Sequence, residues 1–141
     1  MEQNLKNHIR LVPGYHYLLS LLLLGGFVGS VRHLFGSLDS ENLYSASLIV
    51  LLFVIAFLMA AFARTFALKA QDRAIRAEES LRYYILTGKS LPVLKVSQVV
   101  ALRFASDAEF PALVERSAKE GLGNKKIKEA IVNWRPDFHR V

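Results

Sequence analysis

The sequence predicts an all-α membrane protein: a two-helix transmembrane hairpin whose second helix extends into the cytoplasm, followed by a small C-terminal helical tail. Residues 43–63 carry no charged side chain, and as a helix rising ~1.5 Å per residue they span a hydrocarbon core of ~30 Å. A second apolar stretch lies within residues 15–35, and hydrophobic residues make up 52% of the chain. Because neither Pro nor Gly follows Ala63 before Gly88, the second helix should continue beyond the bilayer.

The first span has its apolar core between Tyr15 and Val31, which crosses the bilayer if Arg32 extends its side chain to the surface. Pro13 and Gly14 separate it from an N-terminal cytoplasmic or interfacial segment, residues 1–14. The Leu-rich run also resembles a secretory signal peptide, but the second apolar segment follows at once and favours a hairpin. Gly25 and Gly29 form a G-x-x-x-G motif, and Gly26 with Ser30 repeats its spacing, so this helix has a face suited to close helix packing.

A short outer loop, residues 36–42, leads into the second helix, which comprises the span 43–63 and a cytoplasmic helical extension, residues 64–87, ended by Gly88. Spacings of three and four along this helix define a line of residues that we call the seam. The seam comprises Phe53, Ala56, Ala60, Ala63, Ala67, Ala70, Ala74, Ala77, Leu81 and Tyr84. Small side chains at heptad spacing predict close packing against another helix, either of a second copy or of the same chain. The alternative is a stiff helix, since Ala is the best helix former.

Outside the span, the face of the second helix opposite the seam is predicted to be solvated. Asp72 with Arg76, and Glu78 with Arg82, form i,i+4 pairs of the favourable orientation, each worth a few tenths of a kcal/mol.

The C-terminal cytoplasmic tail, residues 88–141, contains three short apolar patterns. Val93, Val96, Val100 and Phe104 fit a helix or an extended segment. Phe110, Leu113, Val114 and Ser117 predict a helix ending near Gly121, with Ser106 and Glu109 as its capping box. Ile127, Ala130, Ile131 and Trp134 predict a helix capped by Asn124 and stopped by Pro136. Such short helices bury a marginal core, so we expect them to pack on the long helix or on a neighbouring copy.

The distribution of basic residues predicts the orientation. Lys6 and Arg10 precede the first span, Arg32 lies between the spans, and every other Lys or Arg follows Ala63. The positive-inside rule therefore places both termini in the cytoplasm. Basic residues beside the membrane or near the start of the last helix are candidates for contact with anionic lipid headgroups, although the second group also fits a solvated turn. These residues are Arg64, Lys69, Arg73, Lys125, Lys126 and Lys128.

Three stretches resemble a family of small, functionally uncharacterised bacterial membrane proteins. They run from Ala63 to Arg73, from Ala101 to Ala105 and from Asn133 to Asp137, and the likeness covers the whole chain. The resemblance implies a two-span protein of the bacterial inner membrane, and it brings no activity, substrate or site residue.

Little in the sequence indicates catalysis. The chain has no Cys, its four His are not at metal-ligand spacing, and phosphate-binding or nucleophile motifs are absent, so we expect no enzyme, cofactor or metal site. The stretch from Gly121 to Lys125 is similar to the start of a LuxR-type helix-turn-helix. Only residues 137–141 follow Pro136, so there is no room for a recognition helix, and we expect no nucleic-acid binding.

The sequence thus predicts a non-enzymatic bacterial inner-membrane protein that forms a homo-oligomeric scaffold or accessory assembly of undetermined copy number. An alternative is a small homo-oligomeric channel, its pore lined by Tyr44, Ser45 and Ser47 or by the glycine face of the first span. A third is a membrane-anchored regulator that docks a soluble protein through residues 89–141.

Overall fold

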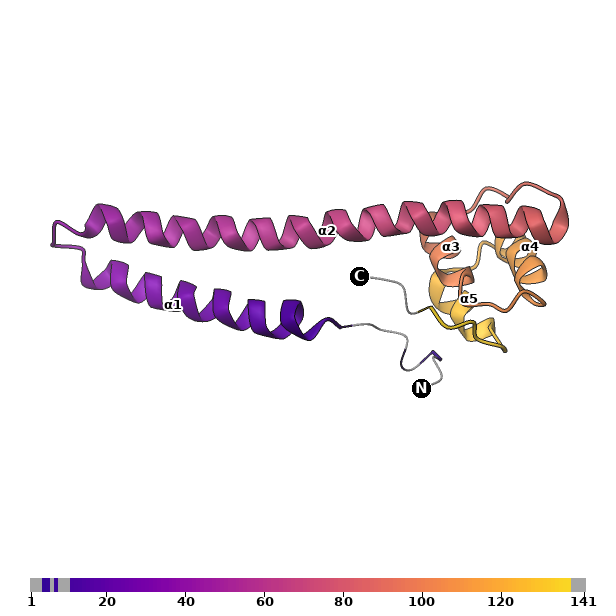
Figure 1. The fold of residues 1–141 in the computed structure, drawn as a ribbon, viewed down its shortest axis with the longest axis horizontal. Coiled ribbons are helices and arrows are strands. Elements are labelled where there is room, and N and C mark those ends of the chain that lie inside the picture. The colour runs from indigo at the N-terminus through magenta and orange to yellow at the C-terminus, as the bar shows by residue number, and fades with distance from the viewer. Residues whose placement is uncertain (1–3, 6, 8–10, 138–141) are drawn as a thin grey trace. The chain divides into compact units, whose positions relative to one another are not determined.

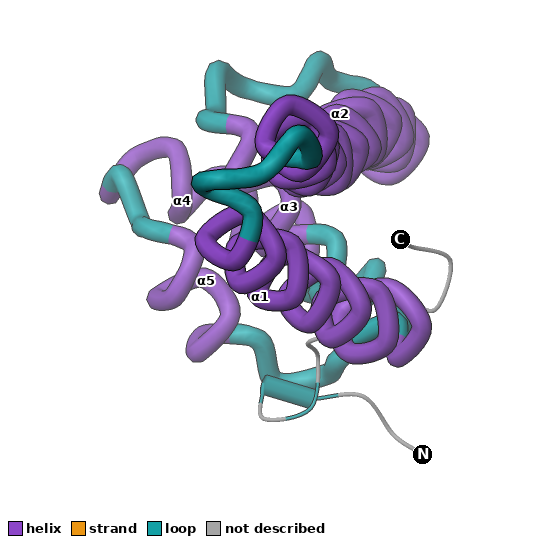
Figure 2. Tube along the Cα trace, turned by 90° about the vertical axis from the view of Figure 1, so that its left-hand side faces the viewer, coloured by secondary structure: helices purple, strands orange, loops and turns teal. Residues whose placement is uncertain are grey.

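The computed structural model describes residues 4–5, 7 and 11–137 and contains helices and connecting loops (Figures 1 and 2). The elements are a π-helix η1 (Gly14–Leu19) and five α-helices: α1 (Ser20–Gly36), α2 (Leu43–Thr87), α3 (Val96–Leu102), α4 (Phe110–Glu120) and α5 (Asn124–Ala130). Over the described ranges there is no strand, and a single isolated antiparallel bridge joins Ala105 to Trp134. The predicted all-helical class is therefore confirmed.

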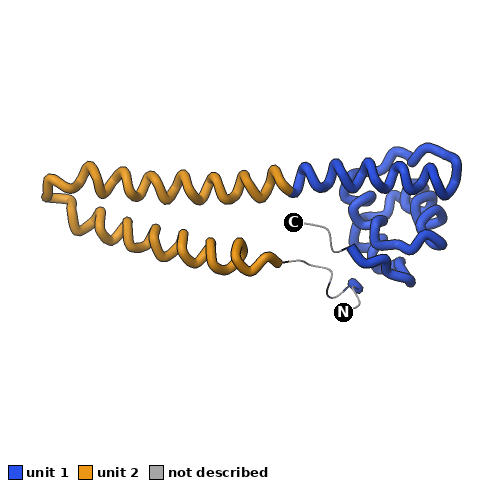
Figure 3. Tube along the Cα trace, viewed as in Figure 1, with its two compact units in different colours: residues 1–10, 68–141 blue, residues 11–67 orange. Residues whose placement is uncertain are grey.

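The chain divides into two compact units (Figure 3). The apolar unit is residues 11–67, comprising η1, α1 and the first part of α2. The C-terminal unit is residues 68–141 together with residues 1–10, and it contains the rest of α2 and helices α3, α4 and α5. Half of the predicted segment 1–14, residues 1–3, 6 and 8–10, lies outside the described residues.

Inside the apolar unit, side chains of the continuous helix η1–α1 contact α2 at three places among the described residues. The Tyr15 hydroxyl donates a hydrogen bond to the Ala60 carbonyl, and the rings of Phe27 and Phe57 meet edge to face with centroids 5.8 Å apart. The Phe53 ring occupies the space beside Gly26, because a Cβ at residue 26 would lie 2.3 Å from the ring. These contacts bring the start of one apolar stretch next to the end of the other.

Within the described residues, two helices are long and apolar enough to cross a membrane: Gly14–Gly36 and Leu43–Thr87. Only 6% of the most apolar window of each helix is buried. A core helix of a water-soluble protein would hide most of such a surface. Large side chains such as Leu21, Leu52 and Met59 are instead exposed around this unit.

Helix α2 ends in the C-terminal unit at the predicted position. Gly88 follows Thr87 with a φ of +69°, and its N–H donates to the Tyr84 carbonyl at 2.7 Å. Glycine takes this left-handed conformation without the steric cost that a Cβ imposes. The helix end is thus set by the local sequence.

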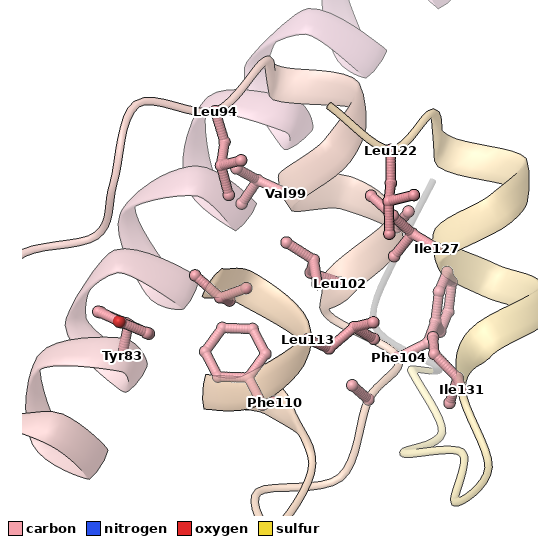
Figure 4. Packing of buried hydrophobic residues seen from close by; sticks show 13 residues of the cluster. Tyr83, Leu94, Val99, Leu102, Phe104, Phe110, Leu113, Leu122, Ile127 and Ile131 are labelled. Carbon is pink, nitrogen blue, oxygen red and sulfur yellow. The ribbon is translucent and has the colours of Figure 1, made fainter. Parts of the chain in front are cut away.

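The core of the C-terminal unit forms where α3, α4 and α5 gather on α2 (Figures 1 and 4). Phe104, Phe110 and Ile127 are among its largest fully buried side chains. Tyr83 of α2 belongs to the same cluster and meets the Phe110 ring edge to face, with centroids 6.2 Å apart. Of the two predicted alternatives, the long helix or a neighbouring copy, the structure shows the short helices packed on the long helix of the same chain.

Helix α4 matches its predicted pattern. Its buried residues are the four predicted ones, Phe110, Leu113, Val114 and Ser117, and Gly121 ends the helix with a φ of +62°. The Glu109 carboxylate accepts from the Ser106 N–H at 3.3 Å, which is one of the two bonds of the predicted capping box. The other is not formed, because α4 begins at Phe110 with Glu109 as its N-cap and no side-chain cap bond. It also accepts from the N–H groups of Val132 and Asn133, both at 3.1 Å, so it ties α4 to the segment after α5.

The other two patterns of the tail were partly wrong. α5 stops at Ala130, and Ile131 has an extended backbone. Trp134 is not helical: it forms the bridge with Ala105, and its ring packs on the Phe104 ring with centroids 5.1 Å apart. The helix begins at Asn124, with Gly123 rather than Asn124 as its N-cap. α3 covers only Val96–Leu102, which leaves Val93 98% exposed before it and Phe104 buried after it. Apolar spacing alone did not distinguish helical residues from buried loop residues.

Candidate functional site

Arg82 on α2 is the centre of a cluster of charges in the C-terminal unit, in which Glu79 is buried and Asp107 is exposed. Its Nη1 donates to Glu79 Oε2 at 2.9 Å, and its Nε donates to Asp107 Oδ1 at 2.7 Å. Its Nη2 donates to the Ala105 carbonyl at 2.7 Å, and the guanidinium lies 4.2 Å from the centre of the Phe110 ring. The planar guanidinium thus holds the loop after α3 on α2.

The carboxylate of Glu79 is buried, with the residue only 5% exposed, and it has Arg82 as its close ionic partner. Arg135 lies farther away, with Nη1 at 3.9 Å from Glu79 Oε1. A carboxylate taken out of water is stable only when paired in this way. Glu79 and Arg82 therefore form one structural unit.

A second ion pair joins α3 to the segment that follows Trp134. Arg103 is 7% exposed, its Nε lies 3.1 Å from Asp137 Oδ2, and its guanidinium stacks 4.6 Å from the Phe104 ring centre. Both residues of this pair and Glu79 line one cavity of about 560 Å³. Its lining residues are Gln71, Ala74, Ile75, Glu78, Glu79, Arg103, Arg135, Pro136 and Asp137.

The charged groups of this cluster are paired with one another. Among the described residues that line the cavity, they are guanidinium and carboxylate groups. Within the described ranges there is no group of three or more His, Cys, Asp or Glu residues that could hold a metal ion. The arrangement fixes the tail on the long helix.

Sequence reasoning missed this cluster. The face of α2 predicted to be solvated carries Ile75, Glu79 and Tyr83, and all three are buried. Arg82 pairs with Glu79 and Asp107 instead of the predicted Glu78. The available signal was the spacing of Ile75, Glu79 and Tyr83, four residues apart each time, which is the period of a packed helix face.

The seam has two environments in the single chain. In the apolar unit, Phe53, Ala56, Ala60 and Ala67 are half-buried and Ala63 is exposed. In the C-terminal unit every seam residue is exposed: Ala70, Ala74, Ala77, Leu81 and Tyr84. At ~100° per residue these five residues lie on the side of α2 opposite Ile75, Glu79 and Tyr83. The chain's own tail therefore packs on the other side of the helix.

The two glycine spacings of the first span also separate. Gly26 and Ser30 face the second helix, since the Phe53 ring abuts Gly26 and Ser30 is 6% exposed. Gly25 and Gly29 are exposed, and a Cβ at either position would meet nothing within 4 Å. The G-x-x-x-G pair thus remains available for another helix.

The predicted lipid-contact residues are mostly on the surface. Lys69 and Arg73 are exposed and Arg64 is half-buried. Near α5, Lys126 is exposed, Lys125 lies 3.9 Å from Glu129, and the Lys128 ammonium lies 5.8 Å from the Phe104 ring centre. Lys128 thus lies against the folded core, whereas Lys69 and Arg73 are exposed.

Two long helices with unburied apolar surface, together with a small folded helical unit, define the class of the described part of this chain. The chain belongs to a family described as "Family of unknown function (DUF6526)", whose model matches residues 1–141. No curated protein and no solved structure matches it. The resemblance to an uncharacterised family, read from the sequence, is confirmed.

Proposed function

We propose that this chain is a non-enzymatic protein of the bacterial inner membrane, a two-span hairpin with both termini in the cytoplasm. Its copies assemble through the seam into a structural scaffold or an accessory subunit. The observation that carries the proposal is the state of α2 beyond the apolar stretch. There the chain's own tail covers one face of the helix, and the seam on the opposite face is exposed from Ala70 to Tyr84.

Membrane insertion is supported by the burial pattern of the apolar unit. The apolar side chains of both long helices point outward, which is favourable in hydrocarbon and unfavourable in water. Tyr15 at the start of the first span bonds to Ala60 near the end of the second, so both ends fit one face of a bilayer. The exposed cation Lys69 follows this boundary and suits anionic headgroups of the cytoplasmic leaflet.

Assembly is supported by the continuity of the seam along one uninterrupted helix, Leu43–Thr87. A partner that covers the whole seam must itself be a helix that leaves the bilayer at the same depth. A second copy of α2 meets this condition without any further component. Alanine side chains allow the two backbones to approach closely, in lipid as well as in water.

The test is the mass of the full chain in mild detergent, measured by light scattering. We expect an oligomer that Ala77→Arg dissociates, because a long charged side chain cannot fit in a close helix contact. The matched control is Ala118→Arg, an exposed alanine on α4, which should leave the mass unchanged. A wild-type chain that is monomeric at all concentrations would contradict the proposal.

The orientation is tested separately. A reporter fused after Val141 should be active only on the cytoplasmic side, and activity on the outer side would contradict the proposed topology.

A further inference from the structure

The extramembrane part of the seam is flanked by charges of opposite sign. In heptad notation the seam residues Ala74 and Leu81 occupy position a, and Ala70, Ala77 and Tyr84 occupy position d. Arg73 then occupies position g and Glu78 the following position e. Both are exposed, and neither has an ion-pair partner within the described residues.

Large apolar side chains lie next to these charges outside the predicted span. Leu81 is 60% exposed, Tyr84 58% and Ile85 72%. Leu81 and Ile85 border a hollow that Asp107 and Arg135 of the tail also line, but the tail leaves both side chains exposed. Their burial against a partner would therefore remove apolar surface from water.

We propose that a second copy of this chain packs on this face in parallel and in register, with Arg73 of each copy paired to Glu78 of the other. The inference rests on the proposed function, since a shared membrane fixes both helices in the same direction and at the same depth. In parallel coiled coils a residue at g meets the residue at the next e of the partner helix. Because the two copies are related by a two-fold axis, Arg73 of each copy meets Glu78 of the other, which gives two contacts. An antiparallel or shifted pair of helices does not bring these residues together.

Charge reversal tests the pairing. In the Arg73→Glu homodimer both inter-chain contacts become Glu against Glu, and in the Glu78→Arg homodimer both become Arg against Arg. A mixture of the two variants restores both attractions in the heterodimer, as does the double variant Arg73→Glu/Glu78→Arg in its homodimer. When the single variants carry different affinity tags and are co-expressed, we expect roughly fivefold more heterodimer than random mixing gives.

Single cysteines test the register independently, because the chain has no Cys of its own. Ala70→Cys and Ala77→Cys should each form a disulfide-linked dimer on mild oxidation, since a disulfide needs Cα atoms about 4.4–6.8 Å apart. Arg76→Cys is the control: it is exposed on the same helix but off the seam, and it should remain monomeric on a denaturing gel.

The outcomes separate the inference from the proposed function. One outcome is a chain that is oligomeric by mass, in which the charge variants mix at random and cysteines cross-link equally on and off the seam. That result would overturn the parallel in-register pair but would leave the proposed oligomer unaffected. A chain that is monomeric by mass would remove both. Preferential heterodimers with cross-links only at Ala70 and Ala77 would support both.

Discussion

Helix α2 follows opposite burial rules in its two parts. In the apolar unit, large apolar side chains such as Leu52, Leu58 and Met59 are exposed, and the half-buried positions include Ala56 and Ala60. In the C-terminal unit the buried positions of the same helix are Ile75, Glu79 and Tyr83. One part is apolar on the outside, and the other is apolar on the inside with a buried ion pair.

If the apolar part lies in a membrane as proposed, the difference suits one helix to two solvents. In hydrocarbon the outside of a helix need not be polar, because lipid is as apolar as the side chains. In water the apolar face must be covered, and α3, α4 and α5 cover it. A buried carboxylate is tolerated only in the second part, where Arg82 lies 2.9 Å away.

The largest expected effect comes from removing the buried ion pair of the C-terminal unit. Arg82→Ala leaves Glu79 buried without its close partner, which should lower the free energy of unfolding of the C-terminal unit by about 3–5 kcal/mol. Trp134, the only Trp, lies in this unit and reports its unfolding by fluorescence during denaturant titration. Arg76→Ala, at an exposed position, is the control and should change the value by less than about 0.5 kcal/mol. An unchanged Trp134 transition in Arg82→Ala would contradict the role assigned to the pair.

A charge introduced into the apolar unit tests whether its exposed apolar surface lies in a membrane. Leu52→Asp places a carboxylate near the middle of the predicted span, at a cost of about 3 kcal/mol for insertion. We expect less chain in the alkali-washed membrane fraction. Val93→Asp, at a 98% exposed position of the C-terminal unit, is the control and should leave that fraction unchanged. Equal amounts for both variants would mean that the outside of the two units is not chemically different.

A smaller effect on stability is expected from Ser117 in the core of the C-terminal unit. Ser117 is fully buried, and its hydroxyl has no hydrogen-bond partner among the residues that the structure describes. Ser117→Ala removes an unpaired polar group and should raise the free energy of unfolding by about 1 kcal/mol. Ser97→Ala, at an exposed position, should leave it unchanged. Destabilisation by Ser117→Ala would show that the hydroxyl is bonded in solution.

The smallest effect concerns pH. Burial, and then the nearby charge of Glu115, raises the pKa of the Tyr83 phenol above its ordinary value of 10.0. Below about pH 10 the phenol is neutral in both the folded and the unfolded chain, so its ionisation does not lower the free energy of unfolding. Above that pH the unfolded chain loses the proton first, and stability falls until the folded pKa is reached. Tyr83→Phe should abolish this loss, whereas the exposed Tyr84→Phe should retain it in titrations followed by Trp134.

Several elements could be predicted because their signals are local. Helix α2 ends where Gly88 supplies a left-handed residue, and α4 buries the four side chains that share its apolar face. The end of α5 was missed because Ile131 and Trp134 fit a helical period equally well. Their actual positions depend on long-range backbone bonds, such as that from the Arg135 N–H to the Phe104 carbonyl at 2.7 Å.

The charge cluster could not be derived for a similar reason. Glu78 and Glu79 are both within reach of Arg82 along a helix, and helix geometry alone favours neither strongly. The choice falls to Glu79 because the loop carrying Asp107 and the Ala105 carbonyl comes to that face of α2.

The sequence by itself determined that the chain is helical, that two helices are long and apolar enough to span a membrane, and that the long one ends at Gly88, since composition and backbone preferences act locally. Only the tertiary structure decided which face of α2 the tail covers, which carboxylate Arg82 binds and which glycine pair faces the second helix. These choices depend on contacts between residues far apart in the chain, and periodicity within one element carries no information about them.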